Sequence, residues 1–220
     1  GSLVPRARTV AWWLAPLFAL GLSTGCKDRR STGELIPPSD AAAWDSRHAQ
    51  YYDDDYTRQP VNLRGRAPHD VRDQRLLAAR LGYSDVIAEV EVLQVWGRGR
   101  YQGRQEQYLE LEIKQLLLGE LRKETNDKQL VMVRAEDELP GTLQGQSLLL
   151  FLRWAPEQVP PYHLHLMPVE PEAMAYIAAV IEHAKAEGVL DDKGVPAQSG
   201  RKRSGGKRRA KARKEAEAAE

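Results

Sequence analysis

The feature that most constrains the fold is an alternation of apolar and polar side chains in the middle of the chain. Residues 84–96 read SDVIAEVEVLQVW and place Glu89 and Glu91 on one side of an extended backbone. The other side carries Val86, Ala88, Val90 and Val92. A period of two residues with β-branched side chains is typical of a strand buried on one face. Because that face must be covered, this segment indicates a core built on a sheet.

The same signal recurs at a spacing that suits a small antiparallel sheet. Residues 108–114 alternate again, and the glycines within 97–100 predict a hairpin turn between this strand and the first. Three more short apolar runs lie at residues 129–134, 146–154 and 162–167. Five strands in this arrangement predict a small β-barrel.

Two helices are predicted to flank the strands. The first begins at Pro68 and ends at Gly82, and the second begins at Pro171 and ends at Gly188. Proline in the first turn and glycine after the last are the usual boundaries of a helix. The sequence therefore predicts a mainly β domain over residues 68–188 with an N-terminal and a C-terminal helix.

The chain has one cysteine, so it cannot form an internal disulfide. Cys26 follows a basic start with Arg6 and Arg8 and a short apolar run, and Leu22 and Gly25 stand close before it. This arrangement resembles the signal peptide of bacterial lipoproteins. The resemblance implies removal of residues 1–25, a diacylglyceryl group on the Cys26 thiol, acylation of the new terminus and attachment to a membrane.

Two other interpretations of this segment remain open, an uncleaved anchor and a secretory signal that leaves a free thiol. The apolar run of residues 10–22 is shorter than the ~20 residues that a spanning helix needs. Ser23 also departs from the lipoprotein pattern, which prefers leucine three residues before the cysteine. Lys27, in place of an aspartate that favours inner-membrane retention in lipoproteins of this kind, points to the outer membrane.

The segments SDVIAEVEVLQV, YLELEIKQLLLGEL and GQSLLLFLRW, in this order after a short helix, resemble the netrin-like or TIMP-like version of the OB fold. The likeness covers about residues 76–168 and includes Gly119 after one strand and the Gly145 turn before another. It implies an OB-like five-stranded β-barrel. The protease inhibition of animal members depends on disulfides and on an amino-terminal cysteine, so that activity is not expected here.

Residues 26–67 show no sustained apolar period and are predicted to be a lipidated, disordered tether. Four aromatic residues are unusual in a spacer and are candidates for partner binding, or for docking on the domain itself: Trp44, Tyr51, Tyr52 and Tyr56. The acidic run 53–55 lacks the loop pattern of a calcium site and is expected to be solvated.

Residues 189–220 are predicted to be a disordered basic tail, since positions 201–220 hold nine Lys or Arg and three Glu. The tail could be a solubilising end or could bind an anionic envelope polymer or lipid headgroups. Nucleic acid is not an expected partner of an exported chain. The candidate polyanion-binding residues are Arg201, Lys202, Arg203, Lys207, Arg208, Arg209, Lys211, Arg213 and Lys214.

Chemistry-bearing patterns are sparse. His163 and His165 would lie on one face of a strand about 6–7 Å apart, a spacing that metal sites use, although two ligands do not make a site. No nucleophile motif or phosphate loop is present in the sequence, and no cofactor is expected. We therefore expect a non-enzyme, a lipid-anchored envelope protein that acts as a binding or adaptor subunit with envelope protein partners. The alternatives are a polysaccharide or small-ligand binding lipoprotein and a metal-dependent hydrolase.

Overall fold

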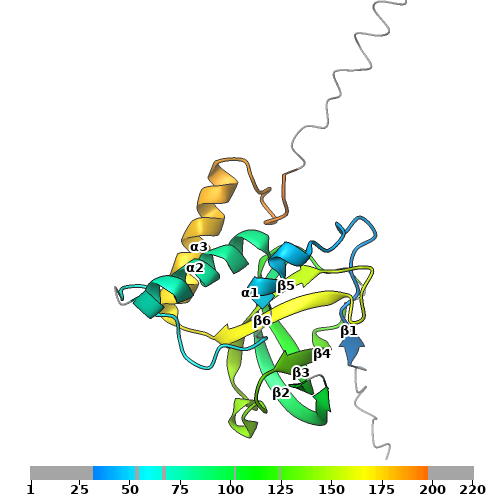
Figure 1. Cartoon of the computed structure of the whole chain (residues 1–220). Helices are drawn as coiled ribbons and strands as arrows, with labels where there is room; N and C mark the ends of the chain where they lie inside the picture. The colour runs from blue at the N-terminus through cyan, green and yellow to red at the C-terminus, as the bar shows by residue number, and fades with distance from the viewer. Residues whose placement is uncertain (1–31, 53–54, 66–67, 102, 124, 198–220) are drawn as a thin grey trace, which may run out of the picture.

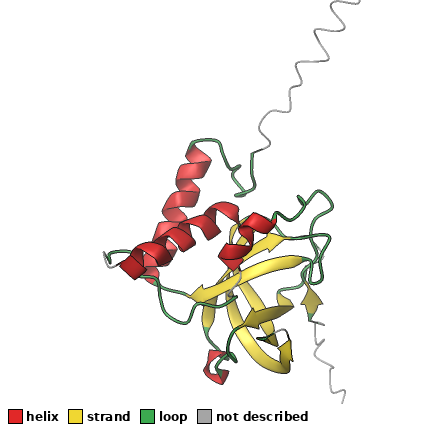
Figure 2. Ribbon diagram, viewed as in Figure 1, coloured by secondary structure: helices red, strands yellow, loops and turns green. Residues whose placement is uncertain are grey.

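The computed structural model describes residues 32–197 except 53–54, 66–67, 102 and 124. Within this range a mixed six-stranded sheet is covered on one side by helices (Figures 1 and 2). The strands are β1 (Gly33–Glu34), β2 (Val86–Tyr101), β3 (Arg104–Leu118), β4 (Lys128–Ala135), β5 (Ser147–Trp154) and β6 (Tyr162–Pro168). The helices are η1 (Ser46–His48), α1 (Ala49–Tyr52), α2 (Pro68–Tyr83), η2 (Gly141–Leu143) and α3 (Pro171–Ala186).

The predicted strands and flanking helices are present, so the mainly β class is confirmed. The order in the sheet is β1-β4-β3-β2-β5-β6, with β1 parallel to β4 and every other pair antiparallel. The predicted turn at residues 97–100 is wrong, because these residues continue β2. The register shifts between Gly97 and Gly99, which indicates a bulge that keeps the strands paired.

Both faces of the sheet are buried, and each has its own apolar cluster. Inside the curve of the sheet lie the alternating residues of β2 together with side chains from the other strands, among them Val90, Leu111 and Leu150. On the outer face, Ile87 and Phe151 are fully buried beneath the helices, which contribute Leu77 and Ile177. The helices therefore stabilise the fold by covering the second face of the sheet.

A closed barrel is not what the structure contains, since the two ends of the five-stranded curve, β4 and β6, do not pair with each other. A side chain joins them instead. The backbone N–H of Met132 in β4 donates a hydrogen bond of 3.1 Å to the hydroxyl of Tyr162 in β6. The sheet is thus strongly curved and open along one seam, between β4 and β6.

The prediction of a disordered tether is wrong for the described residues between 32 and 65, because they pack on the sheet. Leu35 is 2% exposed and joins the inner cluster, while Tyr52 and Val61 are buried in the outer one. The apolar side chains in this segment are few, but each enters a core built by other elements. The packed body therefore includes described residues well before residue 68, among them Leu35.

The first residues of the predicted disordered tail are ordered, since Leu190 and Pro196 form a β-bridge and the Gly119 N–H donates to the Gly194 carbonyl at 3.1 Å. Residues 26–31 and 198–220 lie outside the described residues.

Candidate functional site

A short extended segment, residues 55–58, lies along the open seam, and we call it the strap. Its backbone pairs with the free edge of β6: Leu166 N–H donates to the Asp55 carbonyl and Thr57 N–H donates to the Leu166 carbonyl, both at 2.8 Å. The Asp55 carboxylate accepts a hydrogen bond from the backbone N–H of Arg134 in β4. The strap therefore connects both strands that border the seam and satisfies backbone groups that would otherwise be left at open edges.

The two histidines proposed as metal ligands contact the segment before α2. His165 is fully buried, and its Nε2 lies 2.7 Å from Thr57 Oγ1 of the strap. His163 stacks on Trp44 with ring centroids 3.7 Å apart and hydrogen-bonds to the Gln158 side chain at 2.7 Å. Among the described residues, no group of three or more His, Cys, Asp or Glu side chains is placed to hold a metal ion.

The aromatic residues proposed for partner binding contribute to internal packing. Tyr52 is 1% exposed, and its hydroxyl lies 3.0 Å from the Ser84 hydroxyl. Burial raises the pKa of Tyr52 to about 12. Tyr51 stacks on Tyr83 with centroids 5.2 Å apart. Docking of this stretch on its own domain, one of the two alternatives, is therefore what the structure contains.

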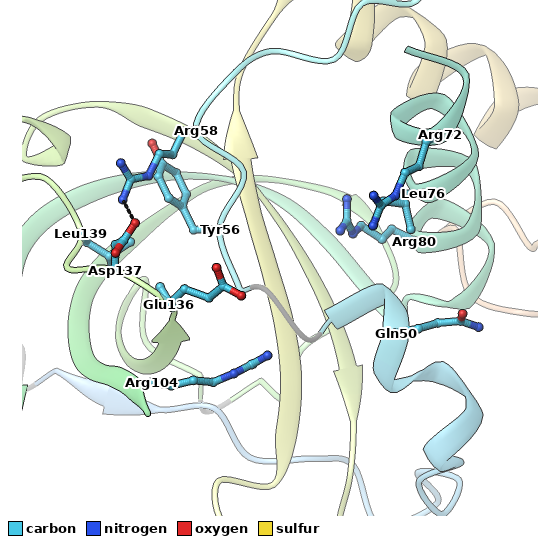
Figure 3. Close-up of a pocket in the computed structure, with 11 residues that line it drawn as sticks. Gln50, Tyr56, Arg58, Arg72, Leu76, Arg80, Arg104, Glu136, Asp137 and Leu139 are labelled. Atoms are coloured by element: carbon cyan, nitrogen blue, oxygen red, sulfur yellow. Dashed lines mark hydrogen bonds and ion pairs between the residues drawn. The ribbon is translucent and has the colours of Figure 1, made fainter. Parts of the chain in front are cut away.

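A cavity of about 520 Å³ opens beside the strap, between α2 and the end of β4 (Figure 3). We call it the arginine cavity, because four of its lining residues are arginines. It is lined by Gln50, Tyr56, Arg58, Arg72, Leu76, Arg80, Arg104, Ala135, Glu136, Asp137 and Leu139. Figure 3 shows Arg72 and Arg80 extending from α2 and Arg104 approaching from the side of β3.

Arg80 is fixed in the wall of this cavity. Arg80 is only 4% exposed, and its Nε–H donates a hydrogen bond of 2.7 Å to the Tyr51 carbonyl. Arg58 is held more loosely, since its ion pair with Asp137 at 3.2 Å joins two side chains that are 59% and 71% exposed. Exposed pairs of this kind contribute little to stability. The cavity thus combines one buried guanidinium with three more accessible ones.

A second cavity of about 110 Å³ adjoins the seam and shares Arg104 with the arginine cavity. Its lining includes Asp55, Tyr162 and His163. Burial raises the pKa of Tyr162 to about 12. Both cavities therefore border the strap and β4, and the smaller one also borders β6.

The sequence predictions did not identify the cavity arginines, because Arg58, Arg72, Arg80 and Arg104 come from three separate segments and form no motif. One signal was available. Arg80 stands next to Leu81 and three residues after Leu77, on the apolar side of a predicted helix. A charge in an apolar stripe is unusual and indicates either a buried partner or a binding role.

The residues proposed for lipidation and signal-peptide recognition lie outside the described residues, as do those of the basic tail. In the part of the chain that the structure describes, no helix is both long enough and apolar enough to span a membrane. Comparison with family models, with curated proteins and with solved structures finds no match for this chain.

Proposed function

We propose that this chain is a lipid-anchored binding protein of the bacterial envelope that holds a ligand in the arginine cavity without transforming it. The observation that carries the proposal is the cavity with Arg80 fixed in its wall at 4% exposure. Polar groups of the protein, among them the Tyr51 carbonyl, hold this guanidinium, so Arg80 is a fixed and compensated part of the wall. A concave site with a few convergent polar groups is typical of ligand binding.

The chemistry of the lining favours binding over catalysis. Arginine stays protonated in proteins, so it can orient and neutralise a ligand but does not accept a proton from it. The carboxylates among the lining residues are Glu136 and Asp137, and Asp137 forms an ion pair with Arg58. This composition supports the small-ligand or polysaccharide binder more than the hydrolase.

The anchoring part of the proposal rests on Cys26 and the residues before it. A diacylglyceryl group on the thiol would hold the protein at a membrane, and Lys27 favours the outer one.

We also propose that β2–β6 form a partly open OB-like barrel. In support, the five strands are antiparallel neighbours, and Asp55 of the strap contacts both edges of the seam.

An adaptor role is the second candidate, and exposed Trp96 favours it. Trp96 lies opposite Tyr108 on the β2–β3 ladder and is 48% exposed. Exposed tryptophan is enriched at protein interfaces. If the adaptor role is correct, Trp96→Ala should abolish co-purification of a specific envelope protein, whereas Val159→Ala, at a site 90% exposed, should not.

Native mass spectrometry of the full chain extracted from bacterial membranes tests the binding proposal. We expect an additional small-molecule mass on the wild-type protein and its loss from Arg72→Gln and Arg104→Gln. Arg64→Gln is the matched control, since Arg64 pairs with Glu172 and does not line the cavity. Ligand mass retained equally by all variants would overturn the assignment of the site to the cavity.

A further inference from the structure

The second half of β2 lies at an unpaired edge of the sheet. Strand β5 pairs with β2 only as far as Glu91, and the last backbone bonds on that side involve Val92, whose N–H donates to the Gln146 carbonyl at 2.9 Å. Among the described residues, positions 94–100 of β2 pair with β3 alone, and we call them the open edge. Alternate backbone groups of an antiparallel strand point away from its partner, so those of the open edge have no strand beside them.

The open edge is fixed on its inner side and exposed along its length. Val95 packs against the inner apolar cluster. Trp96 is 48% exposed, and three further residues of this segment are exposed as well: Gly97, Gly99 and Arg100. An exposed, unpaired edge is a template on which another extended chain can add as a strand through main-chain hydrogen bonds.

The charges of the open edge favour an acidic strand beside it. Its charged residues are Arg98 and Arg100, and it contains no Asp or Glu. Arg100 makes no hydrogen bond or ion pair within the described part of the chain. Glu106, which lies opposite Gly99 on β3, is already paired with Arg134 at 3.3 Å. A carboxylate on an added strand would therefore form an opposite-charge pair across the strands, which stabilises the pairing.

A second copy of the chain is a poorer occupant of this edge. Antiparallel pairing of two open edges about Gly99 would bring Arg98 and Arg100 of one copy beside the same residues of the other. Like charges directly opposite each other destabilise a strand pair. The register shift between Gly97 and Gly99 also bends the edge, so a flexible segment adapts to it better than a second rigid sheet.

Resting on the adaptor role, the second candidate function, we propose that the open edge of β2 binds an acidic, extended segment of a partner protein as an added strand. Trp96 would flank this strand, and aromatic side chains pair well with β-branched ones across strands. The partner segment therefore combines Glu or Asp with β-branched residues and lacks proline where its backbone pairs.

NMR of the full chain with three synthetic peptides tests this proposal. The first is acetyl-Thr-Glu-Val-Glu-Val-Thr-amide, the second has Lys in place of Glu, and the third has Pro in place of Val and so loses main-chain donors. We expect the first peptide to bind about 10-fold more tightly than the second, from the charge pairs, and than the third, from the main-chain bonds. It should also slow hydrogen exchange of backbone amides in the open edge and leave β6 unchanged.

Two variants and a control locate the contact. Arg100→Gln should weaken binding of the first peptide about 3-fold, since one cross-strand charge pair is lost, and Trp96→Ala should weaken it by a similar factor. Arg75→Gln, at an exposed site on α2, should leave binding unchanged.

Equal binding of the Glu and Lys peptides, equal binding of the Pro peptide, or protection confined to another strand would overturn the proposal. Protection of the open edge that grows with protein concentration without peptide would also overturn it, because the occupant would then be a second copy. If no peptide binds at millimolar concentration, the inference fails. Loss of a co-purifying envelope protein from Trp96→Ala would in that case leave the adaptor role standing, and unchanged co-purification would remove both.

Discussion

At the scale of single residues, Gly119 shows how closely β3 approaches the start of β2. Its φ of +78° lies in the left-handed region, and a Cβ at this position would be 2.0 Å from the Asp85 carbonyl oxygen. Its N–H also donates to the Gly194 carbonyl at 3.1 Å. The backbone conformation and the contact with Asp85 each require glycine here.

Gly119→Ala should therefore lower the free energy of unfolding by about 2 kcal/mol or more, from the left-handed backbone and the steric contact together. Urea denaturation followed by circular dichroism measures this. Gly141→Ala is the matched control because no atom lies within 4 Å of its added Cβ. Equal midpoints for the two variants would contradict the account of Gly119.

Tyr52 and Tyr162 are expected to lower the stability of the fold at high pH. Burial raises the pKa of each phenol to about 12, against an ordinary value near 10 in an unfolded chain. Their contribution to stability is complete below pH 10 and is lost as the pH rises from 10 to 12. Tyr162→Phe should flatten this loss, whereas Tyr176→Phe, at a site 37% exposed, should not. Phenolate absorbance and circular dichroism recorded together test this, and ionisation of all tyrosines near pH 10 in a folded protein would contradict it.

Residue patterns predicted the faces of strands better than the roles of polar side chains. The spacing of His163 and His165 placed both on one face of β6, but it could not show that Trp44 and Thr57 cover them. These contacts depend on residues more than a hundred positions away. The spacing of residues within a strand predicts only the face on which a side chain lies. It does not predict which residue that side chain contacts.

At the scale of elements, the strap replaces the strand pairing that would close a barrel. Asp55 contacts β6 through its backbone and β4 through its carboxylate. Thr57 adds a contact with buried His165. The strap therefore stabilises the seam and shapes the wall of the arginine cavity, which Tyr56 and Arg58 line.

Removal of the Asp55 carboxylate should weaken the seam. Asp55→Ala leaves the backbone N–H of Arg134 without this acceptor, and an unsatisfied donor costs about 1–3 kcal/mol. Hydrogen exchange should show faster exchange of the Met132 and Arg134 amides, with smaller changes in β2. Asp40→Ala, at an exposed site, is the control. Unchanged exchange in β4 would show that the strap does not hold this edge.

Long elements were predictable because their periods persist over many residues. Alternation identified β2 and β3, and the Pro and Gly boundaries identified α2 and α3. The two-residue strand β1 and the strap are too short to show such a period. Each is held by only a few pairings with strands distant in sequence. The seam was therefore unpredictable, and with it the cavity.

At the scale of the whole molecule, packed residues occur close in sequence to the proposed lipid site. Cys26 and β1 at Gly33 are separated by seven positions in the sequence, and a chain of that length spans at most about 25 Å when extended. A lipid on Cys26 would therefore keep the curved sheet near the membrane surface. A long tether that frees the domain, as the sequence suggested, is excluded by the packing of the described residues between 32 and 65.

Cys26→Ser should abolish lipidation and cleavage of the precursor when the chain is expressed in a bacterium. We expect the wild type in the detergent-extracted membrane fraction and the variant as an uncut precursor, since the proposed lipidation requires the Cys26 thiol. Ser39→Ala should be processed normally. Identical processing of Cys26→Ser and the wild type would refute the lipoprotein assignment.

The central claim is that the arginine cavity is the binding site of this molecule, and NMR of the arginine side chains tests it most directly. Titration with the small molecule recovered from the native protein should shift the Nε–Hε signals of Arg72, Arg80 and Arg104 with a common dissociation constant and leave Arg64 in place. Shifts confined to arginines outside the cavity, or an unchanged spectrum at saturating ligand, would contradict the claim.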